Sequence, residues 1–434
     1  MTDIAAAAPA GAADDPAPAP RIVTLDIVRG VAVMGILAMN IVAFAMPFQA
    51  YMNPTAYGLE SGADLASWIF SFVFIDGKMR GLFSFLFGAS TLLVIERAQA
   101  SGRSPARIHY ARMLWLLVFG LIHFYFIWFG DILSLYALIG LVLFFFRGLS
   151  VRALVISGIA FVLVQTLVFA LLGVGAMFLS YKAGLPNPDP EIVSQWGEMQ
   201  KGFAPPVGPA LAEKLALFQG PWPGLVESRL IDQMFTPFTG VFLFGWETLG
   251  YMLFGMAALK SGFFRGEWPM ARYRKSALIG FGIGVPAYAL LAWILVRDNF
   301  SVPMIFLVVM GATTPFRPLM IVAIAALIVI LTRNGGFLVD RIAAAGRAAF
   351  TNYLGTSILM TTLFYGYGLG YYGSMSRAEL WLVVVAMWAL MLLWSKPWLD
   401  RYRYGPFEWL WRSLARWRLE PMRKAGAAPV PAEA

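Results

Sequence analysis

Long uninterrupted runs of apolar residues alternate with short polar segments along most of this chain. Each run has about the length of a helix that crosses a membrane, which needs roughly 20 apolar residues. The pattern predicts ten spans, at 24–45, within 64–96, and at 110–128, 132–146, 153–181, 233–258, 276–296, 316–332, 348–366 and 379–397. We therefore expect an all-α integral membrane protein with about ten transmembrane helices.

Two apolar stretches do not fit a single straight crossing. The stretch 64–96 is too long and contains Asp76, Lys78 and Arg80, so we expect part of it to lie at the membrane interface or to line a cavity. The stretch 300–312 is apolar but short, which predicts a re-entrant or interfacial helix.

Composition agrees with this assignment and excludes several chemistries. Only 13% of the 434 residues are charged and 59% are hydrophobic, whereas soluble domains carry about 25% charged residues. The chain has no cysteine, which excludes disulfides, thiolate nucleophiles and Cys-ligated metals. With only two histidines, His109 and His123, we predict no metal site and no tightly bound cofactor.

The distribution of positive charge predicts the orientation in the membrane, because cytoplasmic loops collect Lys and Arg. Most of the 33 lysines and arginines fall on one side if both termini are cytoplasmic. This bias also accounts for the net charge of +9, so we expect contact with lipid headgroups and no nucleic-acid partner. We predict a multi-pass protein of a bacterial-type plasma (inner) membrane.

The segments outside the spans differ in character. We predict disordered tails at 1–20 and 426–434, with no secretory signal peptide at the start. The Pro-rich segment 183–228 is predicted to be an extracytoplasmic loop with one or two short helices, and it separates helical halves at 21–182 and 229–425. Tryptophans and arginines alternate in 404–424, which predicts an interfacial helix or, alternatively, a helix that binds a partner.

Charged side chains inside membrane spans are costly and usually face a cavity or a partner. Asp26 and Arg29 begin the first span and share a helix face, so they are either a self-paired anchor or part of a ligand site. Asn40 lies some 20 Å farther along the same helix, in the outer half of the membrane.

The third and fourth predicted spans form a hairpin with a histidine on one arm. Asp131 follows His123 by eight residues, just after a glycine turn, so the two side chains meet only if the hairpin is tight. A carboxylate that orients an imidazole prepares a general base. The alternative is a histidine that only forms a hydrogen bond between two helices.

Other polar groups inside spans are candidates for binding a substrate or donor. They are Lys78 and Arg80 in the second span, Glu247 in the sixth and Asn352 in the ninth. Glu247 lies in the middle of its span and must be protonated or paired there, either with Lys78 or Arg80 or as a second acid/base group.

Five strings, in order, resemble the YeiB family, whose C-terminal half is the domain of unknown function 418. They are TLDIVRGVAVMGILAMNI, GLFSFLFGAS, GLIHFYFIWFGDILSLYALIGL, GRAAFTNYLGTS and RYRYGPFEWLWRSL, and the resemblance covers roughly 21–420. That family is grouped with the transmembrane acyltransferases. The resemblance implies an acyltransferase-like half at 21–182. It also implies transfer of an acyl group from a cytoplasmic thioester, such as acetyl-CoA, to a hydroxyl or amine of a sugar, lipid or small metabolite.

Related acyltransferases use a polar residue on the first helix and a nearby histidine. The sugar O-acyltransferases commonly have histidine on that helix, whereas this chain has Asn40. In the resulting hypothesis His123, held by Asp131, is the general base and Asn40 donates a hydrogen bond to the oxyanion. Arg29, Lys78 or Arg80 would hold donor phosphates. This layout requires a tunnel of about 15–20 Å from the inner face.

A proton-coupled transporter or exporter of a small molecule is the alternative function. In that hypothesis Glu247, Asp131 and His123 form a proton relay through the membrane. Secondary transporters usually contain inverted repeats. We find no internal repeat between the two halves of the sequence.

Overall fold

The computed structural model describes residues 21–424, and within that range it contains helices and no β-strand. The predicted tails 1–20 and 426–434 lie outside the described residues. The long helices are α1 (Val23–Ala45), α4 (Lys78–Ala100), α5 (Pro105–Ile122), α7 (Val151–Ala183), α11 (Thr236–Lys260), α12 (Met270–Arg297) and α17 (Arg377–Arg401).

Shorter helices connect and cover these. They are α2 (Gln49–Met52), η1 (Pro54–Ala56), α3 (Gly62–Phe70), η2 (Ser71–Ile75), η3 (His123–Ile127), α6 (Leu133–Leu143), η4 (Phe144–Phe146), α8 (Pro190–Phe203), α9 (Pro209–Gln219), α10 (Trp222–Ile231), α13 (Val302–Met304), η5 (Ile305–Ala312), α14 (Arg317–Thr332), α15 (Phe337–Arg347), α16 (Ala349–Phe364) and α18 (Pro406–Arg416).

The chain is a multi-pass membrane protein by the length and hydropathy of its helices. Seven helices of the described part are long and apolar enough to cross a membrane. The count is eight if the pair Val302–Ala312 and Arg317–Thr332, bent by 53°, forms one span. The predicted span 132–146 forms the shorter apolar helix Leu133–Phe146, and the predicted span 348–366 forms the 16-residue helix Ala349–Phe364.

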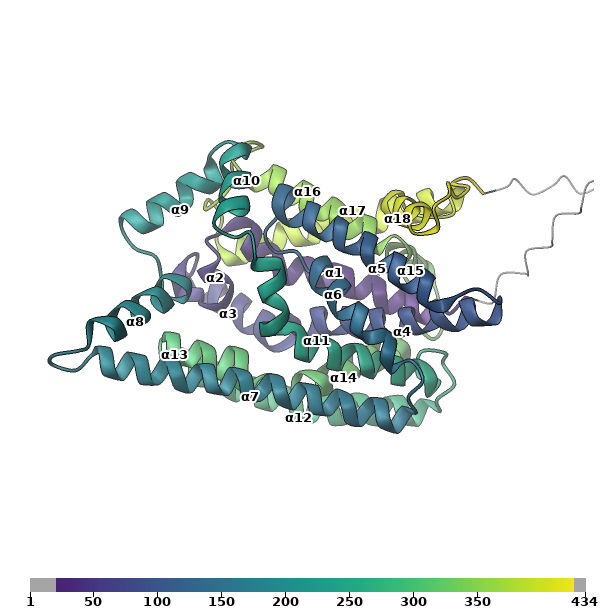
Figure 1. The fold of residues 1–434 in the computed structure, drawn as a ribbon, viewed down its shortest axis with the longest axis horizontal. Helices are drawn as coiled ribbons and strands as arrows, with labels where there is room; N and C mark the ends of the chain where they lie inside the picture. The colour runs from purple at the N-terminus through teal and green to yellow at the C-terminus, as the bar shows by residue number, and fades with distance from the viewer. Residues whose placement is uncertain (1–20, 425–434) are drawn as a thin grey trace, which may run out of the picture.

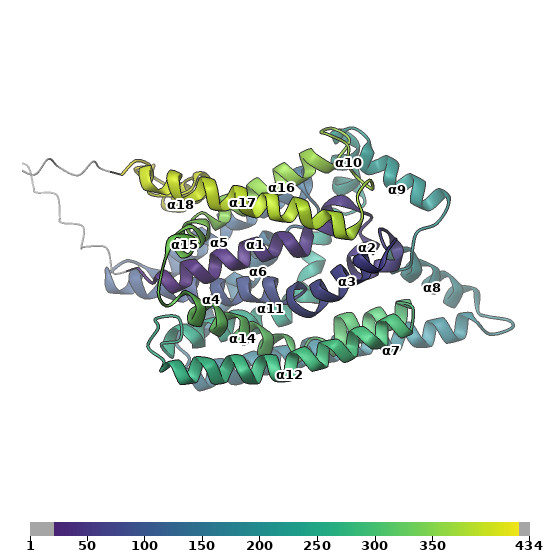
Figure 2. The same ribbon diagram turned by 180° about the vertical axis from the view of Figure 1, so that it is seen from behind.

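The helices form an elongated bundle with two distinct ends (Figure 1). We call the end that carries α15 and α18 the basal end, and the opposite end, with α8 and α9, the distal end. The two ends of the described chain, which precede α1 and follow α18, both lie at the basal end, as the reverse view also shows (Figure 2).

Burial separates central helices from peripheral ones. About 78% of the most apolar window of α1 is buried, compared with 28% for α7, α12 and α17. The peripheral helices expose large apolar side chains such as Leu167 and Leu382, as expected of surfaces that face lipid. The predicted first span is therefore the centre of the bundle, and it packs on α4, α15 and α16.

Glycines allow the central helices to approach closely. A Cβ atom at Gly255 of α11 would lie 1.7 Å from the carbonyl oxygen of Phe85 in α4. A Cβ atom at Gly346 of α15 would lie 1.8 Å from the carbonyl oxygen of Asp26 in α1. Helix packing in membranes relies on such small residues, because lipid provides no hydrophobic force between helices.

The segment between the two halves is more ordered than the sequence predicts. Instead of one or two short helices, it contains α8, α9 and most of α10. Pro190 and Pro209 occupy the first position of α8 and α9, where proline is favourable because no intrahelical N–H is needed. Several of the prolines in the segment therefore begin helices.

The C-terminal helix α18 packs against α5 and α16 at the basal end. The Glu408 carboxylate of α18 accepts hydrogen bonds from the backbone N–H groups of Phe350 and Thr351, at 2.6 and 3.1 Å. It also accepts the Thr351 hydroxyl at 2.5 Å. These are among the first N–H groups of α16, which have no partner within their own helix. Glu408 therefore caps α16 from another part of the chain.

Candidate functional site

His123 and Asp131 meet where α5 turns into α6. The last turn of α5 widens into the π-helix η3, and Trp128 to Ile132 then return the chain to the start of α6. His123 Nδ1 lies 2.9 Å from Asp131 Oδ1, and both side chains are fully buried. The hairpin is tight because Gly120 lets the two arms touch: a Cβ there would lie 2.4 Å from the Ser134 nitrogen.

Both carboxylate oxygens of Asp131 accept hydrogen bonds. Its Oδ2 accepts the backbone N–H of Ser134 at 2.8 Å and the Ser134 hydroxyl at 2.5 Å. Since the carboxylate accepts, His123 donates through Nδ1, and in the neutral imidazole Nε2 then carries the lone pair. This Nε2 is buried and has no hydrogen-bond partner.

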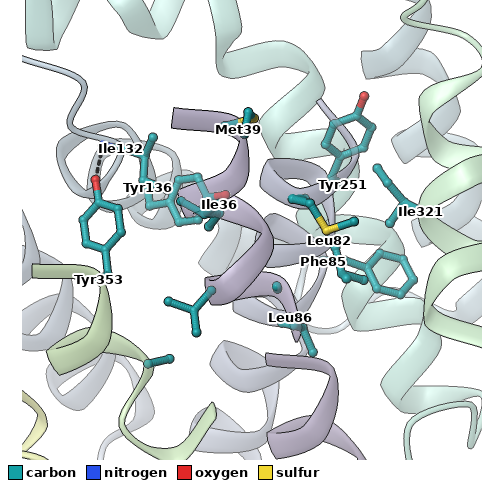
Figure 3. Packing of buried hydrophobic residues seen from close by; sticks show 14 of the residues in the cluster. Ile36, Met39, Leu82, Phe85, Leu86, Ile132, Tyr136, Tyr251, Ile321 and Tyr353 are labelled. Atoms are coloured by element: carbon teal, nitrogen blue, oxygen red, sulfur yellow. Dashed lines mark hydrogen bonds between the residues drawn. The ribbon is translucent and has the colours of Figure 1, made fainter. Parts of the chain in front are cut away.

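Aromatic side chains surround the imidazole. The ring of Tyr353 lies 5.2 Å from that of His123, and its hydroxyl accepts the backbone N–H of Ile132 (Figure 3). Trp128 packs edge-on against His123 at 6.2 Å and stacks on Phe44 of α1 at 3.9 Å. The indole nitrogen of Trp128, like His123 Nε2, has no partner.

A cavity of about 1690 Å³ adjoins this hairpin. Asn40 of α1, Trp128 and Asp131 lie on its wall, whereas His123 is not among the residues that line it. The remaining wall comes from α2, from the starts of α4 and α14, and from residues of α8, α9 and α11. We call this space the distal cavity, because the distal helices α8 and α9 line it.

The position of this cavity corrects one expectation from the sequence. The acyltransferase hypothesis required a tunnel from the inner face, where Asp26 and Arg29 lie, to His123. Neither Asp26 nor Arg29 lines the distal cavity, whose wall is built from the opposite end of the bundle. The hairpin of His123 and Asp131 follows the distal end of α5, so access to it is from α8 and α9.

Glu247 forms a buried ion-pair network with two arginines. It is fully buried in α11, and it pairs with Arg80 of α4 and, at 2.9 Å, with Arg317 of α14. The hydroxyl of Tyr251 donates to the same carboxylate at 3.0 Å. Both carboxylate oxygens are therefore satisfied by cations, which favours the ionised form of Glu247. The predicted pairing with Arg80 is present, and Arg317 was missed.

Two interrupted helices meet beside this network. The first break is at Asp76 and Gly77, between η2 and α4, where Gly77 has a φ of 68°. The second lies between η5 and α14 and precedes Arg317. A Cβ at Gly77 would lie 2.8 Å from Arg317 Nε, so the two breaks are in contact. Arg80 lies on the first turn of α4 and Arg317 on the first turn of α14, and both residues line the distal cavity.

Lys78 and Asp76 have separate surroundings. The Lys78 ammonium is fully buried, donates to the backbone carbonyl of Phe72 and lies 3.3 Å from the ring centroid of Tyr288. Asp76 lines the distal cavity and accepts the Tyr51 hydroxyl at 3.3 Å. Of the charged residues predicted in this stretch, Asp76 and Arg80 reach the cavity, whereas Lys78 does not.

Asp26, Arg29 and Asn352 lie away from the cavity. Asp26 accepts from Arg29 at 3.2 Å, as the i,i+3 spacing predicted, and Arg29 also donates to Ser90 at 2.7 Å. The Asn352 amide nitrogen donates to Ala345 O of α15 and Ser395 Oγ of α17, and its oxygen accepts the indole N–H of Trp394 in α17. These side chains connect helices, and none of the three lines the distal cavity.

Similar proteins cover nearly the whole chain. It is 32% identical to the uncharacterized protein YeiB of Escherichia coli (strain K12) over 425 residues, covering 94% of this chain and 98% of that protein. The chain belongs to the YeiB family. The model of the family DUF418, which is described as "Protein of unknown function", matches residues 258–418.

A second family member comes from a distant bacterium. The uncharacterized protein YxaH of Bacillus subtilis (strain 168) is 31% identical over 422 residues, covering 93% of this chain and 96% of that protein. No solved structure is significantly similar to this YeiB-family chain.

Proposed function

We propose that this YeiB-family protein is a membrane acyltransferase with His123 as its general base. The observation that supports the proposal most is the orientation of this residue: Nδ1 is fixed by Asp131, and Nε2 is left as an unpartnered base. This is the tautomer that a general base requires, because the second nitrogen must accept the proton of the nucleophile.

The reaction proceeds at the thioester carbonyl of an acyl-CoA-type donor. His123 Nε2 takes the proton of an acceptor hydroxyl or amine as the oxygen or nitrogen attacks the carbonyl carbon. Asn40, which lines the distal cavity, donates a hydrogen bond to the oxyanion. The carbon–sulfur bond then breaks, and the imidazolium returns its proton to the leaving thiolate.

The proposal places ten spans in a bacterial inner membrane, with the basal end in the cytoplasm. Eight of these spans are the seven long apolar helices and the bent pair of helices. The other two are the shorter helices Leu133–Phe146 and Ala349–Phe364. The basic basal segments support this orientation. The acceptor, a sugar, lipid or small metabolite, enters the distal cavity from outside.

Transport of a small molecule is the second candidate, and one observation favours it. Two interrupted helices meet at the cavity wall, and many secondary transporters bind substrate at such breaks. The pairing of Glu247 with two arginines argues against its predicted part in a proton relay, because it stabilises the carboxylate without a proton.

The test uses purified protein in detergent with acetyl-CoA labelled in the acetyl group and a membrane extract as the source of acceptor. We expect release of CoA thiol with transfer of label, and a loss of about 10²–10⁴-fold in the His123→Gln variant. The matched control is His109→Gln, because His109 is also buried but bonds to the backbone oxygen of Gly140, away from the cavity.

Equal rates in wild type and His123→Gln would contradict the proposed base. Flux of a labelled metabolite from the extract into proteoliposomes, without acyl transfer, would favour transport instead.

A further inference from the structure

Arg229 is a buried cation without a counter-ion. It lies on α10, with 3% of its surface exposed, and neither Nη1 nor Nη2 has a hydrogen-bond partner. No carboxylate among residues 21–424 pairs with it. An arginine stays protonated in proteins, so this charge is desolvated and uncompensated. Removing a charge from water without pairing costs several kcal/mol.

The position of α10 brings Arg229 next to the catalytic hairpin and the end of α16. The Trp222 indole of α10 donates to the backbone oxygen of Phe126 in η3 at 2.9 Å. Both views show α10 beside the distal end of α16 (Figures 1 and 2). The loop after α16 contributes Tyr365 and Tyr367, whose phenol groups lie within electrostatic range of Arg229.

Two tyrosines of this loop have free hydroxyls. Tyr365 and Tyr372 are 0% and 1% exposed, and neither hydroxyl has a partner. Their rings lie 5.9 Å apart, and both pack on Phe218 at 5.1 and 4.6 Å. The unpartnered Trp128 indole nitrogen faces Tyr365. The region thus collects several buried donors, and no carboxylate of residues 21–424 pairs with Arg229 among them.

We propose that Arg229, with the hydroxyl of Tyr365, binds a carboxylate or phosphate group at the distal end of the protein. A guanidinium presents two parallel N–H donors that match the two oxygens of such a group. The Tyr365 hydroxyl supplies a further donor. Arg229 does not line the distal cavity, so this is a separate site, although Trp128 contributes to both. The inference does not depend on acyl transfer.

The test measures thermal unfolding of the full-length protein in neutral detergent at constant ionic strength. The probes are inorganic phosphate, acetate and dihexanoyl phosphatidic acid, each against chloride. We expect at least one probe to raise the Tm of the wild type saturably, by about 2 °C or more. The shift should disappear in Arg229→Gln and persist in Arg297→Gln, whose arginine is exposed on α12 beside Trp293.

The three probes distinguish the sources of the anion. A shift with phosphate or acetate identifies a soluble ligand, and a shift with the lipid alone identifies a headgroup. No saturable shift with any probe, or an equal shift in Arg229→Gln, overturns the site.

Two milder variants keep the proposal testable if Arg229→Gln does not accumulate. Tyr365→Phe keeps the ring that packs on Phe218 and removes one donor, so we expect binding about 2–10-fold weaker. Arg229→Lys keeps the charge but cannot form the two-pronged contact, and it should weaken binding as well. Wild-type affinity in both variants would exclude the proposed contacts.

Discussion

The carboxylate of Asp131 joins the imidazole of His123 to the start of α6, since one oxygen accepts His123 Nδ1 and the other accepts two donors of Ser134. The orientation of the ring is therefore coupled to the geometry of a helix terminus. A base that is fixed in this way needs no reorientation when the acceptor binds.

The first prediction concerns Asp131→Asn. The amide can still cap α6 by accepting from Ser134, but it cannot stabilise the imidazolium that forms when His123 takes a proton. We expect kcat for acyl transfer to fall about 10²–10⁴-fold, with the Tm nearly unchanged. Ser134→Ala, which removes only the hydroxyl contact, is the control and should keep most of the activity. Full activity of Asp131→Asn would remove the carboxylate from the mechanism.

The second prediction compares two members of the Glu247 network. Glu247→Gln leaves both Arg80 and Arg317 without a carboxylate, so we expect a loss of about 3–5 kcal/mol in stability. Arg317→Gln leaves the pair of Arg80 and Glu247 intact and should cost less. Thermal unfolding in detergent ranks the two variants. If Arg317→Gln lowered the Tm more than Glu247→Gln, the contacts of Arg317 would matter more for stability than the carboxylate that the two arginines share.

The third prediction uses two glycines of neighbouring helices. Gly346→Ala places a methyl group against the backbone of α1, where no flexible side chain can move away, so we expect poor accumulation or a large fall in Tm. Gly355→Ala on α16 is the matched control, because nothing lies within 4 Å of its added methyl group. Helix propensity favours alanine there by up to about 1 kcal/mol. Equal effects of both changes would contradict the close contact of α1 and α15.

The fourth prediction is a dependence of stability on pH that comes from Glu408. Burial raises the pKa of Glu408, although hydrogen bonds from Thr351 and Phe350 oppose this effect. Because the folded-state pKa lies above the unfolded one, this group stabilises the fold most below the unfolded pKa of about 4.3. Its contribution is lost as pH rises through the folded pKa.

The measurement for Glu408 is Tm against pH in three proteins. Glu408→Gln keeps an acceptor for the N–H groups of α16, so its curve should be flatter than that of the wild type. Glu408→Ala removes the cap and should lower stability by about 1–2 kcal/mol at every pH. A wild-type curve that Glu408→Gln leaves unchanged would assign the pH dependence to another group.

The fifth prediction tests the orientation, and the absence of native cysteines makes it simple. Cysteine is introduced singly at Ser194 in α8 or at Asn334 before α15, both exposed positions. A membrane-impermeant maleimide should label the first in intact spheroplasts and the second only after lysis. Labelling of Asn334→Cys without lysis would reverse the proposed topology.

The sequence predicted the helical class, because long apolar runs have few alternatives to helix in a membrane. It also placed His123 and Asp131 close together, subject to a tight hairpin, since that contact is nearly local. The role of Arg317 was missed. Its partner Glu247 is 70 residues away in the chain, and only the packing of both α11 and α14 on α4 brings them together. The direction of the cavity likewise depends on α8 and α9, whose placement no local pattern specifies.

The cap that Glu408 provides has a consequence for biosynthesis. Glu408 lies 58 residues after Phe350 and 57 residues after Thr351, whose N–H groups it accepts. It stands on the last helix that the structure describes. The start of α16 is therefore completed only after the ribosome has made α18. A chain that stops before Pro406 would leave these donors unpaired, so truncation at the C-terminus would weaken a helix that begins more than fifty residues earlier.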